Sequence, residues 1–396
     1  MADKVFSATP RALPRVKLSH APAGPNAFKR MIASADRAEP GDLVAVYDRN
    51  GNAYGVALYN PRSQIALRIF TRDNPEGFDI DAFLRARVGR AAALRRDVLK
   101  LPAATDAYRL VHDYGDGLPG LTADIYKDQI ALEFYSLGMY KLAPRLEAAF
   151  REHFPGAAFH HRASSYTQEM EGFSLPAPAA PARKTRITEN GVQFEVDLRS
   201  GYKTGFFCDQ RDNRLFASSF AAGKKVIDLC SYTGGFGVYA AKLGGADEVT
   251  CVELDPEASE LSKRNANING VKINPVVGDA FMYIRQMLEL KRRYGLVVLD
   301  PYKLVASREE RDKGIFKYRD FNRLALSLVE EGGVFVTCSC SGMVSMEEFT
   351  YIVRGAASNS GRRVQILKKA GAGPDHPVAA DYPEGEYLKC IFARVF

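Results

Sequence analysis

Apolar and polar positions follow different patterns in the two halves of the chain. In the first half, residues 42–47, 53–58 and 64–70 are short stretches rich in Val, Ala, Leu, Ile and aromatic residues, which is typical of β-strands. The turn Asp48-Arg49-Asn50-Gly51 separates the first two stretches and predicts a β-hairpin, because Asn-Gly favours tight turns. Together these stretches predict a small β-barrel-like unit that ends near residue 72.

A mixed segment follows. Residues 80–101 have helical periodicity with interspersed basic positions, and strand patterns occur at 108–111, 121–124 and 129–134. Residues 173–184 (FSLPAPAAPARK) are rich in Pro and Ala and show no periodicity, which favours a linker. We therefore expect an α+β domain and linker over residues 73–184, with the main domain boundary at this linker.

Strands and helices alternate after residue 187. Apolar strands are expected at 225–229, 248–252, 273–277, 296–299 and 333–337, and helices at 237–243, 256–269, 280–290, 320–330 and 345–357. Strands this apolar require burial on both faces. The pattern therefore predicts an α/β fold over residues 185–396, with an open, doubly wound, Rossmann-like parallel sheet.

Composition narrows the class of protein. The 396 residues are 46% hydrophobic and 26% charged, as in ordinary globular proteins. No run of 18 apolar residues occurs, and charged residues and prolines interrupt the first twenty positions. We therefore expect a soluble, cytoplasmic protein that does not enter a membrane. Six cysteines without a Cys-x-x-Cys pair argue against disulfides and against a zinc or other metal site, and favour free thiols.

Positive charge is concentrated at the start of the chain. The net charge is +7, and through Phe70 ten Lys/Arg stand against five Asp/Glu, which gives 10 − 5 = +5 for that part. A basic β-unit favours a polyanionic partner such as RNA, although a solvated basic surface without a partner is the alternative interpretation.

Polar residues follow the expected strands at their carboxyl ends, where doubly wound sheets bind ligands. A glycine-rich turn and three later acidic residues form this set: Asp228, Ser231, Tyr232, Thr233, Gly234, Glu253, Asp279 and Asp300. The G-x-G-x-x-G and P-loop patterns are both absent, which argues against a dinucleotide or ATP. Acidic residues without a basic residue in the turn favour a cationic, ribose-bearing cofactor, S-adenosylmethionine. Glu253 would take the ribose hydroxyls and Asp279 the adenine amino group.

More specific motifs lie in the second half. They are Gly201-Tyr202-Lys203-Thr204-Gly205-Phe206-Phe207, Asp209-Gln210-Arg211, Ser231-Tyr232-Thr233-Gly234-Gly235-Phe236, Ser339-Cys340-Ser341-Gly342 and Asp375-His376-Pro377. With these motifs the chain resembles the bacterial large-subunit ribosomal RNA methyltransferase I family over most of its length. The resemblance implies a PUA-type barrel at residues 1–72, an α+β middle domain at 73–184 and a class I methyltransferase domain at 185–396. It also implies cofactor contacts from Phe207, Asp209 and Gln210, although the segment that holds them has an alternative interpretation as an interdomain strut.

The resemblance also implies a reaction. Members of that family methylate carbon 5 of a cytosine, which becomes nucleophilic only after a thiolate adds to carbon 6. This role falls to Cys340, which follows the strand at 333–337. Asp300 is expected to accept a hydrogen bond from the cytosine amino group or to hold ring nitrogen 3, and Lys303 to neutralise a phosphate or the ring carbonyl. Cys338 is expected to fill the strand rather than to act as a helper thiol.

Two positions depart from the family pattern. Tyr302 replaces the second proline of Asp-Pro-Pro-Lys and offers an aromatic ring that can stack on an extruded base. The barrel carries Gly24-Pro25-Asn26-Ala27-Phe28 where the family shows His-Pro-Trp, and the chain has no Trp.

Basic side chains of the barrel and scattered histidines complete the candidates. The basic set expected to contact phosphates is Lys29, Arg30, Arg62 and Arg68. The pair His160-His161 is expected at the surface, and His376 is expected to shape a loop or a turn.

These observations predict an enzyme that forms 5-methylcytosine in large-subunit ribosomal RNA. Two alternatives stay open: a methyltransferase acting on guanine or on an exocyclic amine, and an RNA-binding ribosome-assembly factor whose methyltransferase fold is idle. A homodimer is expected on general grounds alone.

Overall fold

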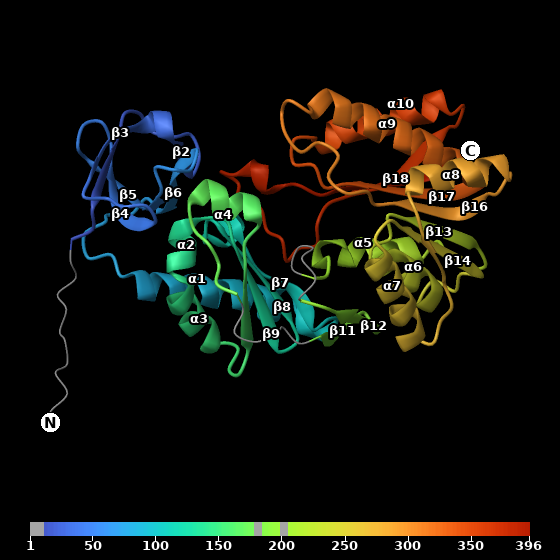
Figure 1. Cartoon of the computed structure of the whole chain (residues 1–396), viewed down its shortest axis with the longest axis horizontal. Coiled ribbons are helices and arrows are strands. Elements are labelled where there is room, and N and C mark those ends of the chain that lie inside the picture. The colour runs from blue at the N-terminus through green and yellow to red at the C-terminus, as the bar shows by residue number, and fades with distance from the viewer. Residues whose placement is uncertain (1–11, 178–183, 199–204) are drawn as a thin grey trace. The chain divides into compact units, whose positions relative to one another are not determined.

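The chain folds into two compact units in a computed structural model that describes residues 12–177, 184–198 and 205–396 (Figure 1). Unit 1 comprises Met1–Lys100, Arg109–Ala182 and Pro377–Gly385, and unit 2 comprises Leu101–Tyr108, Arg183–His376 and Glu386–Phe396. Residues 178–183 of the expected linker and residues 201–204 of the first motif, including Lys203 and Thr204, lie outside the described residues.

Unit 1 begins with a six-stranded sheet. Its strands are β1 (Arg15–Leu18), β2 (Asn26–Phe28), β3 (Ile32–Asp36), β4 (Asp42–Tyr47), β5 (Ala53–Tyr59) and β6 (Ile65–Thr71), in the order β2-β6-β5-β4-β1-β3, with the short helical turn η1 (Lys29–Met31) after β2. Val16, Val44 and Leu67 belong to its apolar core. The hairpin between β4 and β5 is as predicted, and the Asp48 carboxylate fixes it by accepting the amides of Asn50 and Asn52.

The rest of unit 1 is built on a second sheet, in the order β10-β9-β8-β7. The elements are α1 (Ile80–Ala93), η2 (Leu94–Val98), β7 (Ala107–His112), η4 (Asp113–Asp116), β8 (Leu121–Tyr126), β9 (Gln129–Phe134), α2 (Leu137–Lys141), α3 (Ala143–Arg151), β10 (Ala158–Arg162), α4 (Ser165–Glu171) and η6 (Pro383–Gly385). The helix expected over 80–101 is shorter than predicted. After Ala93 it widens into one π-helical turn, in which the buried Arg95 guanidinium forms a bidentate ion pair with Asp116.

Unit 2 contains the alternating elements. They are η3 (Leu101–Ala103), β11 (Thr185–Glu189), β12 (Val192–Val196), η5 (Cys208–Gln210), α5 (Arg211–Ser218), β13 (Lys225–Leu229), α6 (Gly235–Lys242), β14 (Glu248–Glu253), α7 (Pro256–Ile268), β15 (Asn274–Val277), α8 (Ala280–Glu289), β16 (Tyr294–Leu299), α9 (Arg311–Ser327), β17 (Val329–Ser339), α10 (Met346–Asn359), β18 (Val364–Ala370) and β19 (Lys389–Val395).

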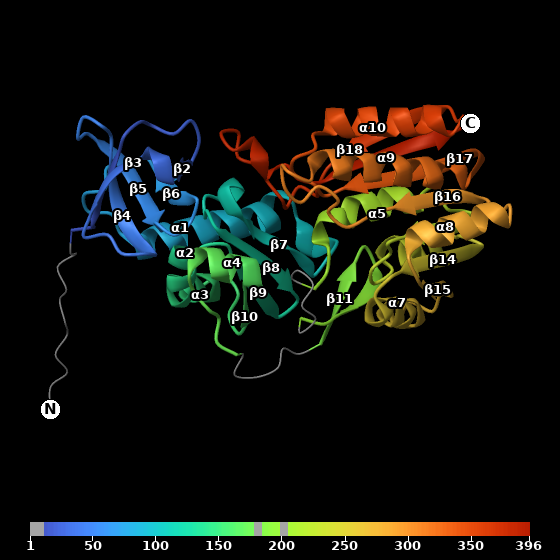
Figure 2. The same cartoon turned by 45° about the horizontal axis from the view of Figure 1, so that its top comes forward.

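The seven-stranded sheet of unit 2 has the order β15-β14-β13-β16-β17-β19-β18. Helices α8, α9 and α10 cover one face and α5, α6 and α7 the other (Figures 1 and 2). This is the α/β, doubly wound architecture that the alternating pattern predicts. The strand order turns back between β13 and β16, so the carboxyl ends of these two strands flank the crevice in which such sheets bind ligands.

Two predictions fail at the far edge of this sheet. The sheet is mixed rather than parallel, because β19 runs antiparallel between β17 and β18. The helix expected at 320–330 ends at Ser327, and Val329 already pairs with Tyr294 in the sheet. Gly332, at a φ of +74°, supplies the bend that lets β17 continue into its buried part.

In the part of the chain that the structure describes, no helix is long and apolar enough to cross a membrane.

Candidate active site

The glycine-rich turn between β13 and α6 is held by Asp228. Its Oδ2 accepts a hydrogen bond from the amide of Gly237 at 2.9 Å, which ties the strand end to the first turn of the helix. A Cβ atom at Gly237 would lie 2.3 Å from Sγ of Cys251 on β14, so glycine is required for this close approach. Gly234, at a φ of +79°, caps α6 in the left-handed conformation.

Four carboxylates converge at the carboxyl ends of neighbouring strands. Asp228 lies in β13, Glu253 ends β14, and Asp279 and Asp300 follow β15 and β16. Burial raises the pKa of the Cys230 thiol, and these four groups raise it further. Burial raises the pKa of Asp228 to about 8, and Asp300 and Glu253 add to the shift. The other three groups, Glu253, Asp279 and Asp300, gather negative charge at one edge of the sheet, which favours a cationic ligand there.

Two of these carboxylates, Glu253 and Asp279, accept hydrogen bonds from backbone amides. Glu253 accepts the amide of Tyr232 at 2.7 Å through Oε2 and the amide of Leu254 at 2.8 Å through Oε1, so it shapes the turn directly. Asp279 caps α8 by accepting the amide of Met282.

Polar atoms in the turn fit a bound cofactor. Among the described residues, Asp228 Oδ1 and Ser231 Oγ are buried and have no hydrogen-bond partner. Buried polar atoms are almost always paired, so two such atoms in one turn fit a polar ligand. Thr233 is also buried, and its carbonyl accepts from Asn265, which anchors the turn to α7.

The segment around η5 reaches both the turn and the end of β16. The Phe207 ring lies edge-on against Tyr232, with centroids 5.1 Å apart. Gln210 Nε2 donates to Asp300 Oδ2 at 3.1 Å, and the Tyr387 hydroxyl donates to Asp209 Oδ2 at 2.5 Å. Phe207 and Gln210 therefore touch residues of the expected cofactor site, and their contact with a cofactor stays a prediction.

A buried ion pair fixes the segment before His376. Arg211 Nη2 donates to Asp375 Oδ1 at 2.7 Å, and both side chains are buried. The amide of His376 donates to the Gly373 carbonyl, which closes a turn. His376 therefore takes part in a turn, in line with one of its two expected roles.

Cys340 lies directly after β17. Its Sγ is 4.0 Å from the Pro301 carbonyl oxygen, in the turn that follows β16 and begins with Asp300. The hydroxyl of Tyr318 lies 3.0 Å from both Ser339 Oγ and Ser341 Oγ, and so clamps the two serines that flank Cys340. The thiol is half-buried.

The neighbouring residues differ in exposure. Cys338 is buried, with its Sγ 3.3 Å from Sγ of Cys390 inside an apolar cluster, which agrees with a strand-filling role. Lys303 is exposed and Tyr302 is 63% exposed, so both side chains can meet a ligand from solvent.

Three side chains around this site were missed by the sequence analysis: Tyr318, Tyr387 and Lys389. The signal for Lys389 is visible in retrospect, because it is a charged residue at the start of the apolar run Cys390-Ile391-Phe392. It is 1% exposed, and its Nζ donates to the Ser341 carbonyl at 2.5 Å.

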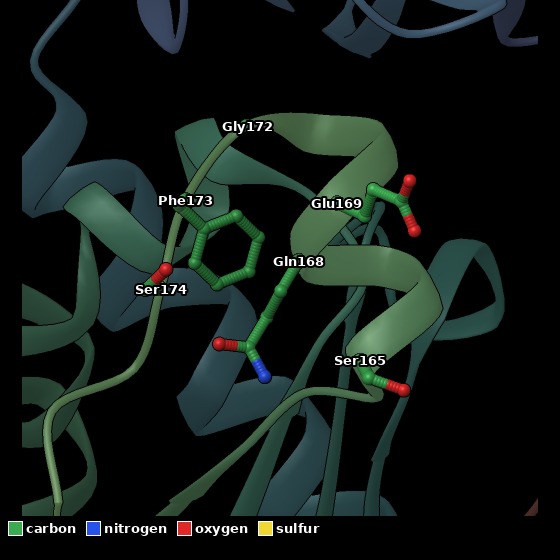
Figure 3. Close-up of a pocket in the computed structure, with 6 residues that line it drawn as sticks. All are labelled: Ser165, Gln168, Glu169, Gly172, Phe173 and Ser174. Atoms are coloured by element: carbon green, nitrogen blue, oxygen red, sulfur yellow. The ribbon is translucent and has the colours of Figure 1, made fainter.

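Two cavities lie in unit 1 and contain none of the predicted catalytic or cofactor residues. The first, of about 550 Å³, is lined by Gln168 and Phe173 beside α4 (Figure 3). The side-chain amide of Gln168 is occupied there, since it donates to Ala163 and accepts from Leu175. The second, of about 450 Å³, is lined by Arg87, among others. The described ranges contain no group of His, Cys, Asp and Glu that could hold a metal ion.

Comparisons with known proteins agree with this geometry. Residues 171–380 match the model of an S-adenosylmethionine-dependent methyltransferase family, and residues 24–72 match a PUA-like domain. Solved structures of similar fold include one described as a SAM-dependent methyltransferase from Streptococcus mutans (TM-score 0.78, 21% identity, covering 96% of this chain and 100% of that one). Another is a methyltransferase complexed with SAH (TM-score 0.77, 22% identity, covering 96% and 99%).

Curated relatives match over nearly the whole length. The ribosomal RNA large subunit methyltransferase I of Shewanella denitrificans is 35% identical over 381 residues, which cover 94% of this chain and 95% of the relative. The protein of the same name from Aeromonas salmonicida is 37% identical over 361 residues, covering 89% and 90%. The chain therefore belongs to the ribosomal RNA large subunit methyltransferase I family, whose cofactor is S-adenosylmethionine.

Proposed function

We propose that the protein forms 5-methylcytosine in large-subunit ribosomal RNA through a covalent adduct of Cys340 with cytosine carbon 6. The observation that carries the proposal is the position of Cys340, whose thiol lies 4.0 Å from the Pro301 carbonyl in the turn that Asp300 begins. A half-buried thiol next to the turn that carries Asp300, at the ligand-binding edge of the sheet, suits nucleophilic attack on a base.

S-adenosylmethionine, when bound, supplies an electrophilic methyl group on a positively charged sulfur. Its positive charge suits the carboxylates Glu253, Asp279 and Asp300 at the strand ends. Asp228 Oδ1 and Ser231 Oγ offer two buried polar atoms. The residues we assign to hold it are Phe207, Asp209, Gln210, Asp228, Ser231, Tyr232, Thr233, Gly234, Glu253, Asp279 and Asp300.

The chain's own groups act on the cytosine. The Cys340 thiolate forms a bond to carbon 6, and the electron pair of the bond between carbons 5 and 6 becomes available at carbon 5. Carbon 5 would accept the methyl group of a bound cofactor, whose sulfur would keep the electron pair of the broken sulfur–methyl bond. A base removes the carbon 5 proton, the double bond between carbons 5 and 6 re-forms, and the thiolate leaves. Asp300 holds the amino group or nitrogen 3 of the ring, and Gln210 keeps this carboxylate in place by donating to Oδ2. The exposed Lys303 neutralises a phosphate or the ring carbonyl.

RNA as substrate is supported by the relatives' names and by the PUA-like match. Lys29 and Arg30 are exposed on η1 and suit phosphate contacts. Arg68 suits them poorly, because its guanidinium is largely buried and pairs with Glu171 at 3.1 Å. Arg62 is exposed as well, so we assign the phosphate contacts of the barrel to Lys29 and Arg30 of η1 and to Arg62.

A trapping experiment tests the adduct. RNA that contains 5-fluorocytidine should form a stable covalent complex with the protein and S-adenosylmethionine, because fluorine at carbon 5 cannot be removed as a proton. Cys340→Ala should abolish the complex, and Cys338→Ala, which removes the neighbouring thiol, should retain it. A complex that persists in Cys340→Ala, or one lost equally in Cys338→Ala, contradicts the proposal.

A further inference from the structure

Lys389 is a buried cation beside the Ser-Cys-Ser segment. It opens β19 opposite Ser339 of β17, and its Nζ donates to the carbonyls of Ser341 at 2.5 Å and Tyr387 at 2.7 Å. Among the described residues, no carboxylate lies within ion-pair distance of this ammonium. A buried charge without a counter-ion is costly, so its position calls for a compensating interaction.

The charges around Lys389 point to Cys340. Burial lowers the pKa of Lys389 to about 8. Among the groups that oppose this shift, the negative charge of a Cys340 thiolate has the largest effect. Glu386 and Glu348 act in the same direction more weakly, and Lys303 acts against them. Electrostatic interaction is mutual, so a charged Lys389 favours the thiolate of Cys340 as much as the thiolate favours the ammonium.

We propose that Lys389 is a positioning residue that holds Cys340 in its thiolate form and fixes the turn that carries it. The two donated hydrogen bonds anchor the carbonyls on either side of the site, and the ammonium supplies the positive charge. The Cys340 proton passes to solvent, and Lys389 stays protonated at neutral pH, below its own pKa of about 8. The proposal deepens the proposed function and rests on it for its catalytic meaning, although the state of the thiol can be measured without RNA.

Alkylation of Cys340 in the full chain tests this inference. The rate of iodoacetamide modification, followed by mass spectrometry of the Cys340 peptide from pH 5 to 10 without RNA or cofactor, reports the thiolate fraction. Lys389→Met removes the charge but keeps an unbranched chain of similar length. In this variant we expect the midpoint of the pH dependence of Cys340 alkylation to rise by about one pH unit. The alkylation rate near neutral pH then falls about tenfold. Lys389→Arg should restore the lower midpoint.

Two controls separate charge from structure. Tyr318→Phe removes the hydroxyl that bridges Ser339 and Ser341 but changes no charge, so it should leave the midpoint in place. Lys389→Gln, which keeps a hydrogen-bonding group, repeats the test should the methionine variant fail to fold. An unchanged midpoint in the folded Lys389 variants, or an equal shift in Tyr318→Phe, would overturn the proposal. Failure of the proposed function is read separately, from methyl transfer by Cys340→Ala.

Discussion

Asp228 links the site to the stability of the fold. Its pKa is raised to about 8 by burial, whereas in the unfolded chain it ionises near pH 4. Between these values the folded form keeps a proton that the unfolded form has lost, so raising the pH favours unfolding. The carboxylate is therefore kept at some cost in stability, which its place in the cofactor turn explains.

Replacing this carboxyl removes the pH dependence. Asp228→Asn keeps an oxygen that can accept from the Gly237 amide but does not titrate. We expect the free energy of unfolding of the variant, minus that of the wild type, to grow by roughly 2 kcal/mol between pH 5 and pH 7. Urea titrations without cofactor measure this difference, and a constant difference across that range would show that Asp228 is ionised in the folded protein.

Glu253 is expected to set cofactor affinity. Its two oxygens accept three backbone amides, so Glu253→Gln turns an amide donor toward at least one backbone donor. We expect S-adenosylmethionine to bind about tenfold more weakly, which corresponds to about 1.4 kcal/mol. Calorimetry measures the affinity, and Glu260→Gln on the exposed face of α7 is the matched control. Equal affinities of the two variants for S-adenosylmethionine would show that Glu253 does not contribute to cofactor binding.

Site residues could be predicted from the sequence where the cofactor site requires an acidic side chain at the end of a strand. Asp228 and Glu253 lie at the carboxyl ends of apolar strands, and Asp279 and Asp300 follow two others. The structure brings these four groups together around Cys230. Tyr318 was not predictable, because its role comes from contacts between α9 and the end of β17 that no local pattern records. For Lys389 the sequence shows only a charged residue at the start of an apolar run, and its contact with the Ser341 carbonyl is set by the pairing of β19 with β17.

At the scale of elements, the approach of α6 to the sheet depends on Gly237. Gly237→Ala places a methyl group 2.3 Å from Cys251 Sγ, and should lower the free energy of unfolding by about 1–3 kcal/mol. Gly355→Ala is the control, because Gly355 lies inside α10 and a Cβ there would meet only Arg319 Nε, at an ordinary contact distance of 3.8 Å. This variant should raise stability by about 0.5–1 kcal/mol. Chemical denaturation distinguishes the two, and an unaffected Gly237→Ala would show that α6 packs less closely than described.

Elements with strong periodicity were predictable, and those set by pairing were not. The apolar strands β13, β14 and β16 and the helix α7 lie where the sequence places them. Strand β19 pairs antiparallel with both β17 and β18. The local sequence pattern does not specify which strands β19 pairs with, or in which direction it runs. The extra residues of β17 arise because Val329 pairs with Tyr294 across a bend at Gly332, although their local pattern resembles a helix end.

At the scale of the whole molecule, the exposed basic residues of η1 predict salt-dependent RNA binding. Replacing Lys29 and Arg30 together by alanine should weaken binding to all RNA sequences and reduce the slope of log K against log salt by about 1–2. Lys263→Ala, on an exposed part of α7 in unit 2, should leave the slope unchanged. Filter binding over a range of salt concentrations measures the slopes, and identical slopes would exclude η1 from the RNA contacts.

The identity of the product tests the central claim most directly. Unmodified large-subunit ribosomal RNA is incubated with the purified protein and methyl-labelled S-adenosylmethionine, and its nucleosides are analysed by mass spectrometry. We predict labelled 5-methylcytidine with the wild type and none with Cys340→Ala. A labelled guanosine or amino-methylated product that survives Cys340→Ala, or no label despite measurable cofactor binding, would contradict the account.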